Sequence, residues 1–175
     1  DDWMEAHLMN AYVVAAALIL YGILFIVVEN INYGKRPAIE RVGDITYKTA
    51  LIIGLFQVLS LVPGTSRSGS TILGAMVLGC SRGVAAEFSF FLGIPVMFGA
   101  SFLKLVKFFV KGNVLTGPQI FYTILGMAIA FGVSVYSIQF LMGYVRRHDF
   151  KFFGYYRIIL GVVVLAYFGI TALAA

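Results

Sequence analysis

Long apolar blocks, nearly free of charge, limit most strongly how this chain can fold. Four of them, at about residues 9–28, 84–106, 118–144 and 152–173, reach the roughly 20 residues that a helix needs to cross a bilayer core. Of the 175 residues, 61% are hydrophobic and 12% are charged, whereas a soluble domain carries about a quarter charged residues. We therefore expect an all-α integral membrane protein with four transmembrane helices, forming a single domain over residues 1–175.

A fifth apolar region, about residues 48–79, is interrupted in its middle. The polar run from Pro63 to Thr71 divides it into two segments, each too short to cross a bilayer. Lipid cannot hydrogen-bond an exposed turn, so this turn must be buried in protein or line a wet cavity. The pattern predicts a re-entrant helical hairpin that enters and leaves the membrane on one side.

Basic residues divide unevenly between the two ends of the predicted bundle. If the hairpin returns to its own side, Lys104, Lys107 and Lys111 lie at one end. The other end holds Lys35, Arg36, Arg41, Lys48, Arg82, Arg146, Arg147 and Lys151. The positive-inside rule makes this second end cytoplasmic. Contact with lipid headgroups accounts for the net charge of +5, so no nucleic-acid partner is expected.

The polar run Pro63-Gly64-Thr65-Ser66-Arg67-Ser68-Gly69-Ser70-Thr71 carries the strongest chemical signal. A guanidinium at membrane depth is unfavourable unless it is paired, so Arg67 is a candidate functional residue. Five hydroxyl groups surround it, on Thr65, Ser66, Ser68, Ser70 and Thr71. Gly64 and Gly69 free the backbone to turn its N–H groups, and the second half-helix presents its positive end. These features suit an oxyanion, whose oxygens match the planar arginine fork.

A structural alternative explains the same residues as a capped helix turn. In it, Arg67 pairs with a nearby carboxylate, for which Glu87 is the obvious partner. Glu87 could instead orient Arg67, act as a base, help to bind a cation, or remain an interfacial charge favoured by its helix dipole. We expect Arg82 to anchor the chain at the membrane boundary rather than to contact a diphosphate. Arg157 lies deeper unless it snorkels to the interface, and Gln57 is expected to form an interhelical hydrogen bond.

Other familiar chemistries leave no signature in the sequence. The single cysteine, Cys80, excludes an internal disulfide framework and a CxxC-type metal site. No Walker loop, HExxH motif or Ser-His-Asp arrangement is present. The residues alone therefore indicate a phosphate-binding membrane protein. They do not separate hydrolysis from transport, because broken helices with anion-seeking N-termini also occur in transporters.

The polar run, followed by Ser81-Arg82 and Glu87-Phe88-Ser89-Phe90, resembles the undecaprenyl-diphosphatase family, also called the bacitracin-resistance or BacA family. The similarity continues at Pro95 and Tyr156-Arg157. It implies inverted-topology repeats, each contributing a re-entrant hairpin to one site. It also implies a bacterial inner-membrane phosphatase that hydrolyses undecaprenyl diphosphate to the monophosphate, recycling the lipid carrier of peptidoglycan synthesis. The alternative is an isoprenoid-phosphate transporter or flippase that cleaves nothing.

The resemblance also implies roles for individual residues. The implied catalytic group consists of Arg67, Ser66, Ser68 and Thr71, with Arg67 holding the diphosphate. The implied substrate-binding group consists of Gly64, Thr65, Gly69 and Ser70. A supporting layer is drawn from Glu87, Arg82, Arg157 and Gln57. Support by a divalent cation, Mg or Ca, is associated with the family, and no residue of this chain is an assured ligand.

An earlier family motif, Glu-x-x-Thr-Glu-Phe-x-Pro-x-Ser-Ser-x-Gly-His, has no counterpart here, and the sequence begins Asp-Asp-Trp rather than with Met. We therefore expect the C-terminal portion of such an enzyme, with the first repeat mostly absent. On this hypothesis the chain supplies the anion clamp, and the missing half supplies the acid and the base and is also a candidate source of the nucleophile. The expected partners are a polyprenyl diphosphate lipid, membrane lipids, that N-terminal half and, in a homo-oligomer, a second copy.

Overall fold

The computed structural model describes residues 10–112, 114–145 and 148–174, which form helices and their connections. The helices are α2 (Ala11–Asn32), α3 (Tyr47–Val58), α4 (Arg67–Val77), α5 (Arg82–Val110), α6 (Gly117–Val145) and α7 (Lys151–Ala174). Two short 3-10 turns, η1 (Val42–Asp44) and η2 (Leu59–Leu61), complete the order. The described part of the chain contains no named strand, and the expected all-α class is confirmed.

Four helices, α2, α5, α6 and α7, are long and apolar enough to cross a membrane, as expected. Helices α5 and α6 contain 29 residues each, which corresponds to roughly 44 Å at about 1.5 Å per residue. A hydrocarbon core is only about 30 Å thick. These two helices therefore either tilt or extend into the headgroup region at their ends.

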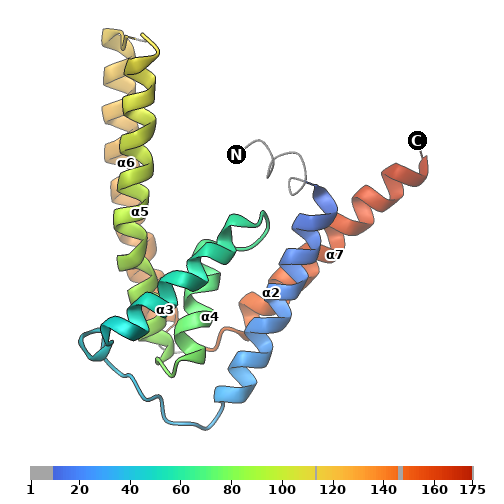
Figure 1. Cartoon of the computed structure of the whole chain (residues 1–175). Coiled ribbons are helices and arrows are strands. Elements are labelled where there is room, and N and C mark those ends of the chain that lie inside the picture. Colours follow the sequence, from blue (N-terminus) through green and yellow to red (C-terminus); the bar gives the residue numbers. More distant parts are fainter. Residues whose placement is uncertain (1–9, 113, 146–147, 175) are drawn as a thin grey trace.

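The interrupted apolar region folds into a hairpin of α3, η2 and α4, whose turn is closed by its own hydroxyl group (Figure 1). Thr65 Oγ1 lies 2.6 Å from the carbonyl oxygen of Val62 and 2.9 Å from that of Leu59. Gly64 has a φ of 91°, and a Cβ added there would lie 2.5 Å from the carbonyl oxygen of Val14 in α2. Glycine is therefore required both for the turn and for docking the hairpin tip on α2.

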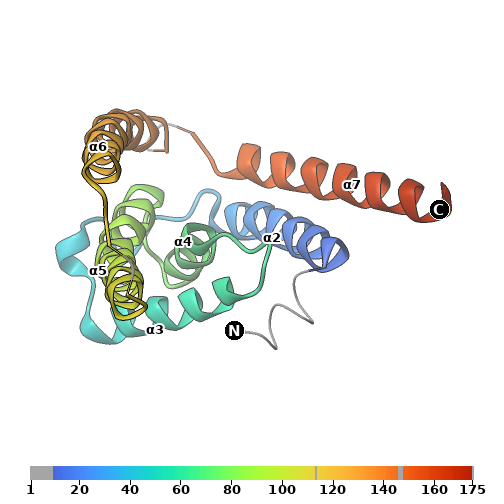
Figure 2. The same cartoon turned by 90° about the horizontal axis from the view of Figure 1, so that it is seen from above.

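The helices form two antiparallel pairs with the hairpin between them (Figure 1). We call them the α5–α6 arm and the α2–α7 pair. Seen from above, α4 lies in the middle, between α5 and α2 (Figure 2), and it contacts both of them and α3. The N-terminus of α4, which carries the predicted anion site, therefore lies between the two helix pairs, with Ser66 and Arg67 half-buried and Ser68 exposed.

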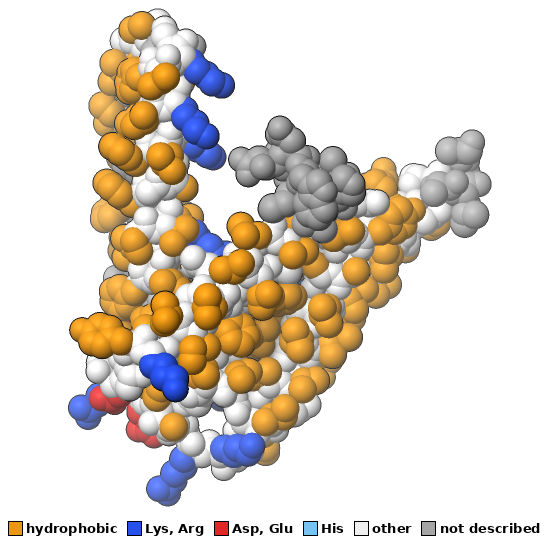
Figure 3. All heavy atoms as spheres, in the orientation of Figure 1, with side chains coloured by type: hydrophobic (Ala, Val, Ile, Leu, Met, Phe, Trp, Pro, Cys, Tyr) orange, Lys and Arg blue, Asp and Glu red, His pale blue; other side chains and the backbone are white. Residues whose placement is uncertain are grey.

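One end of the bundle gathers the connections on either side of the hairpin, as a re-entrant segment requires. The N–H groups of Ala38 and Ile39 donate to the carbonyl oxygen of Gly79 at 2.9 and 3.1 Å, and the N–H of Ser81 donates to Ile39 at 2.9 Å. Acidic and basic side chains cluster at this lower end in Figure 3, while further basic side chains follow the upper part of the α5–α6 arm.

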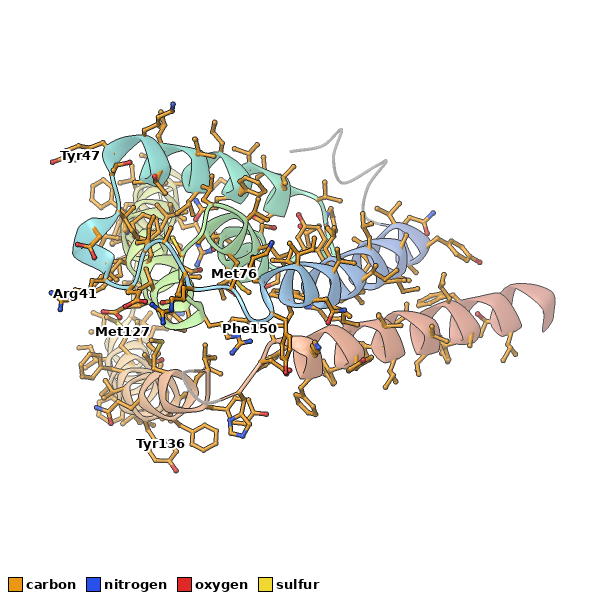
Figure 4. All side chains as sticks on the ribbon, turned by 90° about the horizontal axis from the view of Figure 1, so that it is seen from below. Arg41, Tyr47, Met76, Met127, Tyr136 and Phe150 are labelled. Atoms are coloured by element: carbon orange, nitrogen blue, oxygen red, sulfur yellow. The ribbon has the colours of Figure 1, made fainter. Side chains whose placement is uncertain are left out.

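The core lies where α4 meets α2, α3 and α5, and the outer surface is apolar too. Buried side chains of this core include Phe25, Ile53, Met76 and Phe150. Figure 4 shows Met76 and Phe150 between helices, whereas Tyr136 of α6 points away from the bundle; Met127 of the same helix is 67% exposed. Hydrophobic side chains also cover the outside of both helix pairs (Figure 3). Such a surface is stable against lipid or protein, not against water.

Helices α2 and α7 approach each other through glycines. A Cβ added at Gly22 would lie 2.7 Å from the carbonyl oxygen of Gly154 and 2.7 Å from Ile158 Cγ1. A Cβ added at Gly154 would lie 2.8 Å from the carbonyl oxygen of Gly22. Small residues let two helix backbones come this close, which is a common way of packing helices in membranes.

Substitution Gly22→Leu is expected to separate α2 from α7 and to lower the free energy of unfolding by about 1–3 kcal/mol, because the added side chain overpacks the contact. Thermal unfolding of the purified protein in detergent measures the effect. Gly126→Leu is the matched control, since nothing lies within 4 Å of an added Cβ at that position of α6. Equal stability of the two variants would contradict the glycine contact.

Candidate functional site

The N-terminus of α4 is built by a serine cap. Ser66 has an extended backbone, and its Oγ accepts a hydrogen bond from the N–H of Gly69 at 3.1 Å. Ser66 Oγ also lies 3.1 Å from Ser68 Oγ. The cap satisfies one of the N–H groups that every helix start leaves without an intrahelical partner. Within the described residues, the N–H groups of Arg67 and Ser68 have no such bond and remain available.

The side chain of Arg67 extends from this helix start toward α5. Its Nη2 lies 3.5 Å from the position that a Cβ on Gly93 would occupy. Within the described residues, Arg67 has no side-chain hydrogen bond and no ion pair; the salt bridge found there joins Arg82 to Glu29. The alternative in which Arg67 is held by Glu87 is therefore not the arrangement seen, and the guanidinium keeps its donors for a ligand.

Two of the predicted hydroxyls face the helix packing. Ser70 Oγ is buried 3.0 Å from Tyr21 Oη of α2, and Thr71 Oγ1 is buried 2.5 Å from Ser89 Oγ of α5. Thr71 Oγ1 also lies 3.0 Å from the carbonyl oxygen of Ser68. The structure thus places Ser70 and Thr71 between helices, Thr65 and Gly64 in the hairpin turn, and Ser66, Ser68 and Gly69 at the helix start.

A cavity of about 160 Å³ lies beside Ser66, Ser68 and Gly69, and Arg157 of α7 lines it from the other side. Its remaining lining is apolar and includes Phe25. The Arg157 guanidinium lies 5.8 Å from the centre of the Phe25 ring. Its Nη1 is buried and has no hydrogen-bond partner among the described residues. The structure therefore brings Arg157 to the predicted anion site, where its Nη1 can still donate a hydrogen bond.

Sequence reasoning missed Glu29. It was expected at the start of a surface loop, and this is wrong: α2 continues to Asn32 and leaves Glu29 1% exposed. Its Oε1 accepts from Arg82 Nε at 2.6 Å and also from Nη2, and its Oε2 accepts from the N–H of Phe150 at 3.3 Å. Ile31 continues the apolar pattern beyond the carboxylate, and this was the available signal that the helix goes on.

The remaining supporting candidates lie elsewhere. Arg82 joins α5 to α2 through Glu29, so its observed contact is an ion pair rather than the membrane anchor that was favoured. Glu87 and Arg82 line a larger cleft of about 930 Å³ at the end of the bundle where the connections gather. Gln57 is half-buried in α3, and its side chain makes no hydrogen bond with another described residue.

Comparison with known proteins identifies the family of this chain. The family described as bacitracin resistance protein BacA matches residues 1–163. The chain belongs to this family. It is 58% identical to the undecaprenyl-diphosphatase of Limosilactobacillus fermentum over 98% of this chain and 62% of that protein. The identity is 58% for Streptococcus mutans, over 95% and 59%, and 59% for Desulfitobacterium hafniense, over 96% and 60%.

The chain therefore spans about three fifths of the length of the curated relatives that it matches. Membership of the BacA family and four helices able to cross a bilayer identify it as a membrane protein. Both relationships extend over the polar run and over Arg157, because the matched regions include nearly the whole chain.

A divalent cation finds no complete set of ligands in the described part of this BacA-family chain. No three His, Cys, Asp or Glu side chains there are grouped so that they could hold a metal ion. Magnesium sites commonly use one or two carboxylates together with substrate phosphates. The described residues thus supply no group of three such ligands, the cation stays an expectation of the resemblance, and no step below depends on one.

The thiol of Cys80 is expected to react slowly with maleimides. Burial raises its pKa, and the residue is only 4% exposed at the connection between α4 and α5. Because the thiolate is the reactive form, labelling should accelerate as the pH rises toward this raised pKa. A Cys80→Ser, Tyr47→Cys variant provides the control, since Tyr47 is 96% exposed. Equal labelling rates of the two cysteines in detergent at pH 7 would show that Cys80 is not enclosed.

Proposed function

We propose that the full-length protein hydrolyses undecaprenyl diphosphate to undecaprenyl phosphate and inorganic phosphate in the bacterial inner membrane. This reaction would recycle the lipid carrier of peptidoglycan synthesis. The observation that carries the proposal is Arg67, which stands half-buried at a helix N-terminus between the two helix pairs and has no ion pair among the described residues. The relatives are named undecaprenyl-diphosphatase, and this favours hydrolysis over transport.

The chain's part in this reaction is to bind and neutralise the diphosphate. Water attacks the terminal phosphorus, the bond from that phosphorus to the bridging oxygen breaks, and negative charge accumulates on the oxygens. Arg67, the free N–H groups of α4 and the hydroxyls of Ser66 and Ser68 supply positive potential and donors where this charge develops. They are preorganised, because the cap and the hairpin fix the helix start before substrate arrives.

Proton transfer needs further residues. An acid and a base are required to activate water and to protonate the leaving phosphate. We propose that they lie in the part of the full-length protein beyond these 175 residues, since the chain spans about three fifths of its relatives' length. Carboxylates in that part would also complete any site for a divalent cation, a Mg or Ca ion supporting the reaction.

The proposed partners follow from the surface. The polyprenyl diphosphate lipid is the substrate, and the apolar outer faces of the α5–α6 arm and the α2–α7 pair contact membrane lipid. The remaining part of the full-length protein packs beside the α4 N-terminus to complete the site. A second copy in a homo-oligomer would cover part of the exposed α6 surface, on which large hydrophobic residues such as Phe121, Phe131 and Phe140 are exposed.

Phosphate release from undecaprenyl diphosphate by the purified full-length protein in detergent tests this proposal. We expect one inorganic phosphate per lipid molecule and no further release from the monophosphate product. The control is the same preparation incubated with undecaprenyl phosphate from the start. Binding of the diphosphate without any cleavage would overturn hydrolysis and favour the transporter alternative.

A further inference from the structure

Two arginines stand at the start of α4: Arg67 is the first residue of that helix, and Arg157 comes from the neighbouring helix α7. Arg67 extends toward Gly93 of α5, while Arg157 of α7 lines the 160 Å³ cavity at Ser66, Ser68 and Gly69. In Figure 2, α4 lies between α5 on one side and the α2–α7 pair on the other. Arg67 does not line that cavity. The two guanidinium groups thus serve separate sides of one helix N-terminus.

The fold itself does not use all the donors of Arg157. Its Nη1 is buried without a hydrogen-bond partner in the described part of the chain. The Phe25 ring 5.8 Å away interacts with the charge but accepts no ordinary N–H bond. The buried carboxylate of Glu29 is already engaged by Arg82 and by the N–H of Phe150. A buried guanidinium nitrogen with an unused donor, on a half-buried arginine, calls for an acceptor that enters the cavity.

The cavity combines this donor with two different kinds of wall. Ser66, Ser68 and the backbone at Gly69 form its polar side. Ile72, Ala86, Phe90, Leu141, Val145, Phe150 and Phe153, together with Phe25, form the rest. A free phosphate ion would leave this apolar wall without a partner. A phosphoryl group attached to an apolar chain would place its oxygens at Arg157 and the serines and its first carbons against the apolar wall.

We propose that Arg157 binds the phosphoryl group attached to the isoprenoid, while Arg67 binds the terminal phosphoryl group that is released. This assignment rests on the proposed function and deepens it, because one arginine for each phosphoryl group selects a diphosphate over a monophosphate. After cleavage, Arg157 retains the lipid monophosphate, and the inorganic phosphate at Arg67 leaves independently. Arg157 is thus a substrate-binding residue that determines which product is held.

The roles of the two arginines can be distinguished by measuring how the full-length protein binds a probe for each of the two products. The probes are geranyl phosphate, a short isoprenoid monophosphate, and inorganic phosphate, each measured by equilibrium dialysis in detergent. Arg157→Met should weaken geranyl phosphate by about 10- to 100-fold, which corresponds to the loss of a charged hydrogen bond. It should leave inorganic phosphate within about threefold. Arg67→Met should show the reverse pattern.

Lys151→Met is the matched control, because it removes one positive charge from the same helix. The Lys151 ammonium lies over the ring of Tyr33, 5.6 Å from its centre, and does not line the cavity. It should change neither affinity. Arg157→Lys, which keeps the charge and loses the fork, should recover part of the geranyl phosphate binding and serves if the methionine variant fails to fold.

Equal weakening of both probes by Arg157→Met, no weakening of either, or the same loss in Lys151→Met would overturn the assignment. These binding data do not depend on turnover. If the wild-type protein releases no phosphate but shows the crossed pattern, hydrolysis is refuted and the two-arginine site stands. If it hydrolyses the diphosphate without the crossed pattern, the proposed function stands and the role of Arg157 is refuted.

Discussion

Replacing Arg67 by methionine is expected to lower kcat/KM for undecaprenyl diphosphate, the proposed substrate, by about 10²- to 10³-fold in the full-length protein, the loss typical of removing one preorganised donor to developing charge. The variant still folds and inserts, because Arg67 makes no ion pair or side-chain hydrogen bond among the described residues. Phosphate release in detergent measures the rate, and thermal unfolding confirms an intact fold.

Two further variants sharpen this test of Arg67. Arg67→Lys keeps the charge but loses the planar fork, so it should retain only part of the activity. Arg41→Met removes an exposed arginine that points away from the bundle (Figure 4), and its turnover should match the wild type. Near-normal hydrolysis by Arg67→Met would refute the anion-binding role and return the serine-rich turn to a purely structural one.

Replacing Glu29 by alanine destabilises the fold by about 3 kcal/mol. Removing one partner of a buried ion pair costs about 3–5 kcal/mol, and the lower end applies because the Arg82 side chain is 40% exposed and can turn toward water. The N–H of Phe150 also loses its acceptor. Thermal unfolding of the purified protein measures the change, with Glu40→Ala, an exposed carboxylate in the α2–α3 connection, as the control.

A double substitution tests whether the effect comes from the pair. Glu29→Met combined with Arg82→Met removes both charges and should be less destabilising than Glu29→Met alone, because no unpaired charge remains. The stability loss of the double variant is compared with the sum of the losses of Glu29→Met and Arg82→Met measured singly. If the loss equals that sum, the ion pair contributes nothing to holding α5 and the start of α7 against α2. In that case the stability of this end would come from the apolar core.

Much of the architecture could be predicted because the bilayer imposes rules that are local in sequence. The lengths of the apolar blocks predicted the four spans, and the polar interruption beginning at Pro63 predicted the hairpin. The same rules singled out Arg67, since a guanidinium inside an apolar region is unfavourable without a function. The structure contains the four long apolar helices and a helical hairpin at the polar interruption, whereas the function of Arg67 stays a prediction.

Side-chain partners could not be predicted, because they depend on segments far apart in the chain. Thr71 meets Ser89 across 18 positions and Ser70 meets Tyr21 across 49, so nothing nearby shows that these hydroxyls face the packing. The ion pair of Glu29 with Arg82 spans 53 positions. No local pattern distinguishes a serine at a helix cap that lines a cavity from one that faces a neighbouring helix.

The glycine contact between α2 and α7 also determines the position of Arg157 along the bundle. Gly154 lies less than one helical turn before Arg157, so the place where the two backbones meet fixes how far along the bundle that guanidinium stands. Sliding α7 by one turn would move it by about 5.4 Å along the helix axis. On the proposed two-arginine assignment, an uncharged contact between two helices would therefore set the length of the phosphate chain that fits between Arg157 and Arg67.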